Sequence, residues 1–168
     1  MPITFNADEI FEMAEEIERQ AAGFYTQAAE HAPDEATAGM FREMAEMEED
    51  HEKTFAAMRK DLGAAERETD TFDPQGEAAM YLQAMADAHG TEGKKGRKGK
   101  AGEMTGNESL EEVLEAAVRA EADSVAFYTG IKEMVPARAG RDRIDEIIKE
   151  EIGHLAYLKR RLVELRPQ

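Results

Sequence analysis

The feature that most constrains this chain is an internal repeat of two long helical patterns. With an offset that lays Glu18 on Glu121, the Phe-Tyr-Thr run at 24–26 falls on the same run at 127–129, without a gap. If the repeat served packing alone, the two halves would share their apolar periodicity but differ in their charged residues. Here particular Glu and His residues agree while several apolar positions differ, so we expect these polar side chains to face inward and to meet.

Local signals divide each repeat into two helices. Asn6 with Glu9, and Ser109 with Glu112, form two capping boxes at equivalent positions of the repeat. A proline at residue 33 and another at residue 136 break the two helical stretches. The predicted helices run from Asn6 to about His31, from about Asp34 to Leu62 with Gly63 as a C-terminal stop, from Ser109 to about Met134, and from about Ala137 to Leu165.

This pattern predicts an all-α fold, an antiparallel four-helix bundle made of two repeated hairpins with a long crossover. We expect one domain over residues 1–168, with hairpin one at 6–63, the crossover at 64–108 and hairpin two at 109–168. The crossover should carry a short helix over Gln75–His89. The basic stretch Lys94–Lys100 is interpreted as a solvated linker, with a docking site for an anionic partner as the alternative.

Composition excludes several classes of function. The formal net charge of −16 disfavours nucleic-acid binding and attracts cations. The sequence has no cysteine, so disulfides, thiolate metal sites and cysteine nucleophiles are excluded, and any metal must be held by oxygen and nitrogen atoms. No apolar run is long enough to span a membrane, and the N-terminus has no secretory pattern. We therefore expect a soluble, cytoplasmic protein.

The repeated Glu and His residues have the spacing of a two-metal site. Residues three apart lie on one face of a helix, so each Glu-x-x-His pair projects together. An approximate two-fold axis between the hairpins would gather four carboxylates, whose charge offsets two divalent ions, and two imidazoles, a set that suits Fe, Mn or Zn better than Ca or Mg. The candidate metal ligands are Glu18, Glu48, His51, Glu121, Glu151 and His154.

This set of residues resembles the rubrerythrin branch of the ferritin-like superfamily, in which two helices each give one Glu and two others each give Glu-x-x-His. The resemblance implies two iron ions bridged by Glu48 and Glu151. Nitrogen ligands would be His51 and His154, and terminal ligands Glu18 and Glu121. Tyr25 and Tyr128 follow the single glutamates by two turns, and are either ordinary core aromatics or donors whose hydroxyls bond a ligand carboxylate.

Two departures from rubrerythrins are visible. Without cysteine, the sequence contains no rubredoxin module for electron delivery. Ser124 stands where rubrerythrins tend to place an extra Glu, one turn past the single Glu of the third helix.

Two further acidic residues near the candidate ligands are alternatives to them, Glu15 and Glu150. Their repeat partners, Val118 and Met47, are not acidic. Two histidines without repeat partners are expected at the surface, His31 and His89.

The sequence is compatible with three functions. The first is a di-iron oxidoreductase reacting with O₂ or H₂O₂, of the ferroxidase or peroxide-scavenging type, with an unknown electron donor. The second is a non-catalytic metal-binding or iron-storage protein, in which Mn or Zn could replace Fe. The third is a structural bundle with a vestigial acidic cluster. We expect a homodimer, and the two hairpins of one site could come from different chains.

Overall fold

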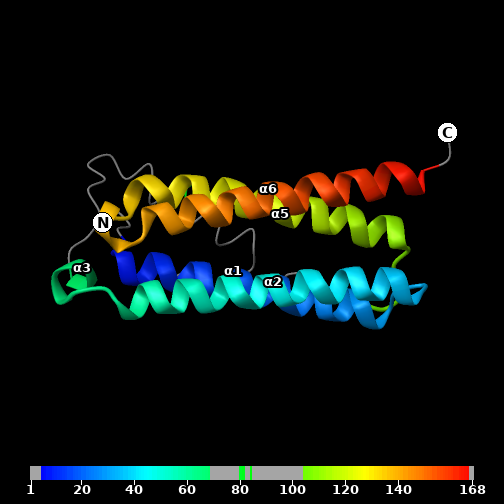
Figure 1. Ribbon diagram of the computed structural model, residues 1–168, viewed down its shortest axis with the longest axis horizontal. Helices are drawn as coiled ribbons and strands as arrows, with labels where there is room; N and C mark the ends of the chain where they lie inside the picture. The colour runs from blue at the N-terminus through cyan, green and yellow to red at the C-terminus, as the bar shows by residue number, and fades with distance from the viewer. Residues whose placement is uncertain (1–4, 69–79, 82–83, 85–103, 167–168) are drawn as a thin grey trace.

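The computed structural model describes residues 5–68, 80–81, 84 and 104–166. Its elements are helical, in agreement with the predicted all-α class (Figure 1). In chain order they are α1 (Ala7–Glu30), α2 (Glu35–Lys60), α3 (Ala64–Glu68), α5 (Leu110–Met134), the 3-10 turn η1 (Ala137–Ala139) and α6 (Arg141–Leu165).

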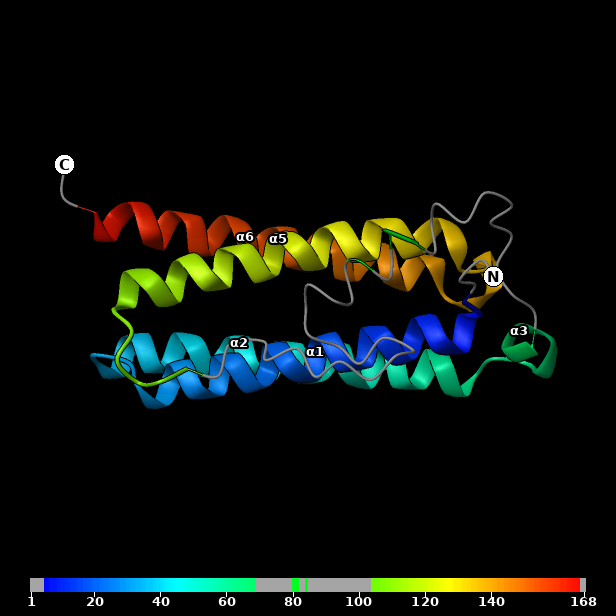
Figure 2. The ribbon, with the colours of Figure 1, turned by 180° about the vertical axis from the view of Figure 1, so that it is seen from behind.

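Two antiparallel hairpins, α1–α2 and α5–α6, lie alongside each other with their long axes nearly parallel (Figure 1). Seen from behind, the chain leaves α3 at one end of the bundle and enters α5 at the opposite end (Figure 2). This arrangement is the four-helix bundle with a long crossover that the repeat predicts. No helix in the described part of the chain is long and apolar enough to cross a membrane.

Both capping boxes form as predicted. The Asn6 amide donates to Glu9 Oε2 over 3.0 Å, and the Glu9 amide donates to Asn6 Oδ1 over 2.9 Å. At α5 the Ser109 amide donates to Glu112 Oε2 over 2.8 Å, and the Glu112 amide donates to Ser109 Oγ over 3.3 Å. Reciprocal bonds of this kind satisfy backbone donors that the first turn of a helix leaves free.

Two predicted helix boundaries were wrong. The last helix begins at Arg141 and not at Ala137, because a 3-10 turn comes first and Gly140 adopts a φ of 105° that ends it. The second helix ends at Lys60, with Asp61 as its C-cap in the right-handed region, and Gly63 has no positive φ. The short helix α3 then follows, which the sequence pattern did not predict.

The predicted crossover helix, 75–89, is described at three positions. Met80, Tyr81 and Ala84 are helical, and the Tyr81 hydroxyl donates to the Ala126 carbonyl of α5 over 2.6 Å. The rest of this helix, including His89, and the stretch Lys94–Lys100 lie outside the described residues. The predictions for those segments remain predictions.

The apolar core consists of two clusters, one in each half of the bundle. The first joins the start of α1, the end of α2, the end of α5 and the start of α6, and includes Phe11, Phe55 and Ile144. The second joins the other ends of the same helices and includes Phe41 and Leu114. The repeat exchanges one cluster for the other, so its two-fold axis passes between them. Buried polar side chains occupy the layer between the clusters on every long helix.

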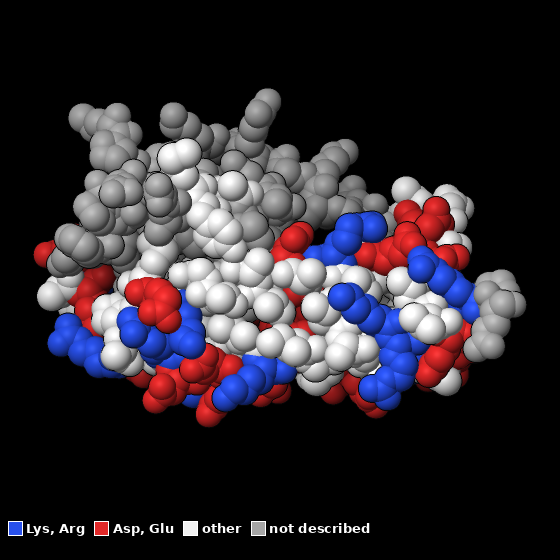
Figure 3. Space-filling model, turned by 90° about the horizontal axis from the view of Figure 1, so that it is seen from above, with Lys and Arg blue, Asp and Glu red and all other residues white. Residues whose placement is uncertain are grey.

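Acidic and basic side chains are both present on the face formed by α5 and α6, around a largely uncharged band (Figure 3). Some of these charges are paired: Lys132 Nζ lies 2.7 Å from Asp145, and Arg166 Nε lies 2.7 Å from Glu111. Such exposed pairs contribute little to stability. The glutamates of the middle layer are a separate, buried population.

Candidate metal centre

Six titratable side chains form one buried layer across the four long helices. None of them is more than 8% exposed. They are Glu18 on α1, Glu48 and His51 on α2, Glu121 on α5, and Glu151 and His154 on α6. All six residues chosen from the repeat therefore lie together.

The helices position this layer by simple periodicity. Glu48 and His51 are three residues apart on α2, so both side chains point from one helix face toward the other hairpin. Glu151 and His154 do the same on α6. Because apolar residues lie one or two turns away on each side, the same stripe that builds the core directs these polar groups inward.

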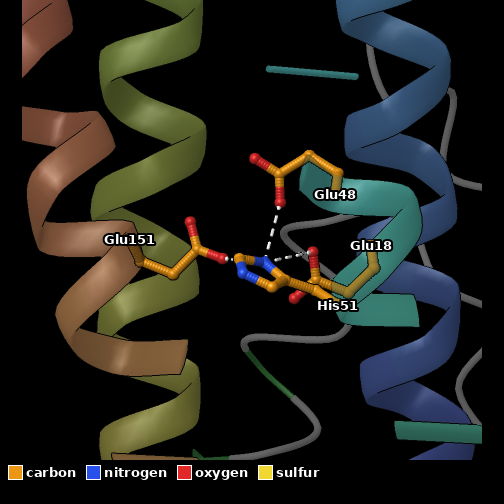
Figure 4. A group of neighbouring side chains, drawn as sticks. All are labelled: Glu18, Glu48, His51 and Glu151. Carbon is orange, nitrogen blue, oxygen red and sulfur yellow. Dashed lines mark hydrogen bonds and ion pairs between the residues drawn. The ribbon is translucent and has the colours of Figure 1, made fainter. Parts of the chain in front are cut away.

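Three carboxylates surround Nδ1 of His51 (Figure 4). This nitrogen lies 2.8 Å from Glu151 Oε1 and 3.2 Å from Glu48 Oε2. Glu18 Oε2 lies 3.7 Å away. One imidazole of hairpin one thus contacts carboxylates of both hairpins.

The environment of His154 repeats this arrangement. Its Nδ1 lies 3.3 Å from Glu48 Oε1, 3.3 Å from Glu151 Oε2 and 3.8 Å from Glu121 Oε2. The rings of His51 and His154 are stacked, with centroids 6.0 Å apart. The layer therefore has two halves related by the repeat.

Each half can offer four ligand atoms to one metal ion. In the first half the atoms belong to Glu18, Glu48, His51 and Glu151, and in the second to Glu48, Glu121, Glu151 and His154. Within each half these atoms lie within 4.8 Å of one another. Glu48 and Glu151 belong to both halves, as carboxylates that bridge two metal ions must.

Two tyrosines bond the outer glutamates across the hairpins. The buried Tyr25 hydroxyl of α1 donates to Glu121 Oε1 of α5, and the buried Tyr128 hydroxyl of α5 donates to Glu18 Oε1 of α1. Each bond reaches the opposite hairpin and not the glutamate on its own helix. The pair orients both outer carboxyls and joins the hairpins at the level of the site.

The pKa values of the four carboxyl groups are shifted in opposite directions. Burial raises the pKa of Glu18 and of Glu121 well above the usual glutamate value, and the charge of Glu151 adds to both shifts. Burial also opposes ionisation of Glu151, but its contacts with His154 and His51 outweigh this and lower its pKa. The pKa of Glu48 is lowered in the same way.

Both imidazoles are held in the charged form. Burial disfavours the charge of His154, but contacts with Glu121, Glu151 and Glu48 raise its pKa to about 12. The same balance raises the pKa of His51. The raised pKa values of Glu18, Glu121 and the two imidazoles favour protonation of these four groups in the metal-free layer. Divalent cations held by the same ligands would displace protons from these groups.

A comparison with protein families decides the identity of the chain. The family model described as Rubrerythrin matches residues 9–92, half of the sequence. The chain belongs to the rubrerythrin family. The matched range contains Glu18, Glu48 and His51, and the internal repeat supplies the equivalent residues of the second hairpin.

This rubrerythrin-family fold also matches a solved structure over nearly its whole length. The structure is that of a candidate ferritin-like diiron-carboxylate protein from Thermotoga maritima. The TM-score is 0.70, with 20% sequence identity, and the match covers 97% of this chain and 98% of the other. At that identity the likeness supports the fold alone. No curated protein matched the sequence.

The buried donor atoms of this rubrerythrin-family layer fit metal ions, because their contacts with one another are ion pairs and few are hydrogen bonds. Glu48 Oε1, both carboxylate oxygens of Glu151 and Nδ1 of His154 are buried and form no hydrogen bond within the described chain. Buried polar atoms that form no hydrogen bond are rare in folded proteins. All of these atoms belong to the two ligand sets, and oxygen with imidazole nitrogen is a donor set that suits Fe, Mn or Zn.

Other candidates from the sequence lie outside the layer. Glu15 Oε1 lies 3.5 Å from Arg59 Nη1, away from the imidazoles, and Glu12 pairs with the same arginine at 3.2 Å. His31 is exposed at the end of α1, as predicted, with Nδ1 2.9 Å from the Gln27 carbonyl oxygen.

Sequence reasoning missed one residue that contacts the layer. The repeat does not identify Glu150, whose equivalent is Met47, yet Glu150 Oε2 lies 2.7 Å from Nε2 of His51. A signal for it was available. Glu150 lies four residues before His154, hence on the same face of α6 as a candidate ligand.

Proposed function

We propose that this rubrerythrin-family chain binds two iron ions and acts as an oxidoreductase on O₂ or H₂O₂, of the ferroxidase or peroxide-scavenging type. The observation that carries the proposal is the sharing of Glu48 and Glu151 by two buried ligand sets. Two metal positions held by common carboxylates are suited to reactions that need two electrons at one place.

A bound pair of Fe(II) ions would supply two electrons, which with two protons reduce H₂O₂ to water or O₂ to H₂O₂. Glu18, Glu48 and His51 would hold one position from hairpin one, with Glu151 shared. Glu121 and His154 would complete the other position from hairpin two. Neither hairpin alone contains a full set, so the function depends on their association.

The surrounding residues would orient these ligands and limit access of water. The hydroxyls of Tyr25 and Tyr128 would hold Glu121 and Glu18 in place through their hydrogen bonds. Phe55 stacks on Tyr128 with ring centroids 5.1 Å apart, and Phe41 stacks on Tyr25 at 6.1 Å. These apolar walls lie on both sides of the layer and lower its local dielectric.

A non-catalytic metal-binding or iron-storage role is the alternative. Two observations favour it over turnover. Ser124, which is buried one turn from Glu121, supplies no carboxylate where rubrerythrins tend to have one. The sequence also has no cysteine with which to build a rubredoxin-type electron carrier. Under this alternative Mn or Zn could occupy the same ligands.

The experiment that tests the proposal is a single-turnover reaction. Metal-free protein is loaded with two equivalents of Fe(II) without oxygen, and H₂O₂ is then added in small portions under a near-ultraviolet spectrometer. We expect one H₂O₂ to be consumed for every two Fe(II), with a new absorption band, and the same protocol with O₂ shows which oxidant reacts faster. The Glu48→Ala variant is the control.

Two results would decide against catalysis. Reaction no faster than that of Fe(II) in buffer would leave metal binding as the function. Iron uptake far beyond two ions per chain would favour storage.

The same proposal treats residues 1–168 as one domain, because each core cluster contains residues of both hairpins. A cytoplasmic location and a homodimer belong to the proposal as well. Size measurement in solution would test the dimer.

A further inference from the structure

The second ring nitrogen of His51 has a partner on the other hairpin. Nε2 of this imidazole lies 2.7 Å from Oε2 of Glu150, on α6. The His51 side chain is 5% exposed, whereas the Glu150 side chain is 61% exposed. The bond therefore connects a buried imidazole to a carboxylate at the surface of the bundle.

The two ends of the ring face different surroundings. Nδ1 faces Glu48 and Glu151 of the candidate centre, as Figure 4 shows. Nε2 is on the opposite side of the ring, where Glu150 accepts a hydrogen bond. Glu150 lies outside both ligand sets and contacts the centre through His51.

The repeat does not preserve this contact. The position equivalent to Glu150 in hairpin one is Met47, whose thioether is a weak acceptor without charge. Nε2 of His154 has no hydrogen-bond partner within residues 5–68, 80–81, 84 and 104–166. His51 thus has partners for both ring nitrogens, whereas within the described residues His154 has ion-pair partners for Nδ1 alone.

We propose that Glu150 is a positioning residue that makes the two metal positions unequal, with the His51 position binding its ion more tightly. This inference rests on the metal-binding part of the proposed function and not on its redox part. By accepting the Nε2 proton, Glu150 selects the tautomer whose Nδ1 lone pair points at the metal position. It also fixes the plane of the ring and strengthens the nitrogen as a donor.

The His154 position has no such support. Its ring can exchange hydrogen bonds of Nε2 with water, and nothing within the described chain selects the tautomer. Loading should therefore proceed in two steps, first on the His51 side and then on the His154 side. A centre with equivalent halves would instead load in one step, or in two steps separated only by repulsion between the ions.

The test is a stepwise Co(II) titration of the full chain, followed by visible absorption. We expect Glu150→Ala to weaken the tighter step about 10-fold and to leave the weaker step unchanged. Glu150→Gln, whose amide oxygen accepts without charge, should fall between Glu150→Ala and the wild type. Met47→Glu should strengthen the weaker step, because by the repeat position 47 relates to His154 as Glu150 relates to His51. Glu146→Ala, on the same helix and exposed, is the matched control.

Proton NMR of the Co(II) form distinguishes a positioning role of Glu150 from a merely structural one. Each bound imidazole contributes one shifted, exchangeable Nε2–H signal. In the wild type one signal should exchange with D₂O at least 10-fold more slowly than the other, and Glu150→Ala should remove that difference.

Unchanged Co(II) constants with unchanged exchange in Glu150→Ala would overturn the inference while leaving the metal centre in place. Equal weakening of both steps would overturn it too, since it would point to general damage to the layer. A wild-type chain that binds no Co(II) would overturn the proposed metal centre and this inference together.

Discussion

The hairpins α1–α2 and α5–α6 are alike in the buried polar layer and differ in the apolar clusters on either side of it. Glu18 and Glu121 are both buried and bond the tyrosine of the opposite hairpin. Away from this layer the halves diverge: the buried Phe55 corresponds to Leu158, and Phe41 to Ile144. Core packing tolerates changes of shape when volume is compensated nearby, whereas a shared polar layer needs the same groups from both sides.

Removal of a shared carboxylate should have the largest effect on metal binding. Glu48→Ala or Glu151→Ala should abolish tight binding at both positions, because each residue belongs to both ligand sets. Metal content after loading with Co(II) and desalting should fall from two ions per chain to nearly none, equally in the two variants. Glu43→Ala, an exposed change on α2, should bind as the wild type does. Retention of two ions in either variant would contradict a shared role.

Removal of either imidazole should affect only one of the two metal positions. His51→Ala and His154→Ala are expected to retain one ion per chain, because each residue belongs to a single ligand set. Isothermal titration with Co(II) should show one step where the wild type shows two. Loss of both steps in one variant but not in the other would mean that the halves load in an obligatory order.

The two tyrosines should affect different halves of the centre, because each bonds a glutamate of the opposite hairpin. Tyr25→Phe leaves the buried Glu121 without its donor, and Tyr128→Phe does the same to Glu18. Each change should lower the free energy of unfolding of the metal-free protein by about 1–3 kcal/mol. Urea denaturation measures this effect. Tyr25→Phe should also weaken the His154 step of metal binding more than the His51 step, and the reverse preference would argue against the crossed bonds.

The smallest expected effect concerns how the hairpins begin their second helices. Hairpin one uses the Asp34 side chain, which accepts from the Thr37 amide over 2.8 Å, whereas hairpin two uses Gly140 with a φ of 105°. Gly140→Ala should cost about 1–2 kcal/mol, because side chains disfavour left-handed backbone. Asp34→Ala should cost about 1 kcal/mol through the lost cap. Thermal unfolding compares the two, and neither change should alter metal stoichiometry.

The hairpins, their caps and the six clustered side chains could be predicted because their signals are local or repeated. The capping boxes at Asn6 and Ser109 need only residues three apart, and the repeat marks the polar positions directly. The start of α6 could not be predicted in this way. It depends on Gly140, where a Cβ would lie 2.7 Å from the Met58 methyl group of the other hairpin.

The partners of the tyrosines also required the structure. Tyr25 lies on the same helix face as Glu18, but seven residues along a helix span about 10.5 Å, too far for a hydrogen bond. Association of the hairpins brings Glu121 to the level of Tyr25 instead. Glu150 was missed for a related reason, because the repeat identifies what the halves share and not what distinguishes them.

The most direct test of the account is an anaerobic Fe(II) titration of the metal-free chain, with released protons counted in the same cell. The raised pKa values of Glu18, Glu121, His51 and His154 favour protons on these groups, and such protons should leave as two divalent ions enter. We predict saturation at two Fe(II) per chain, with proton release that ends at the same point. Saturation at one ion, or binding without proton release, would contradict a two-metal centre whose ligands come from both hairpins.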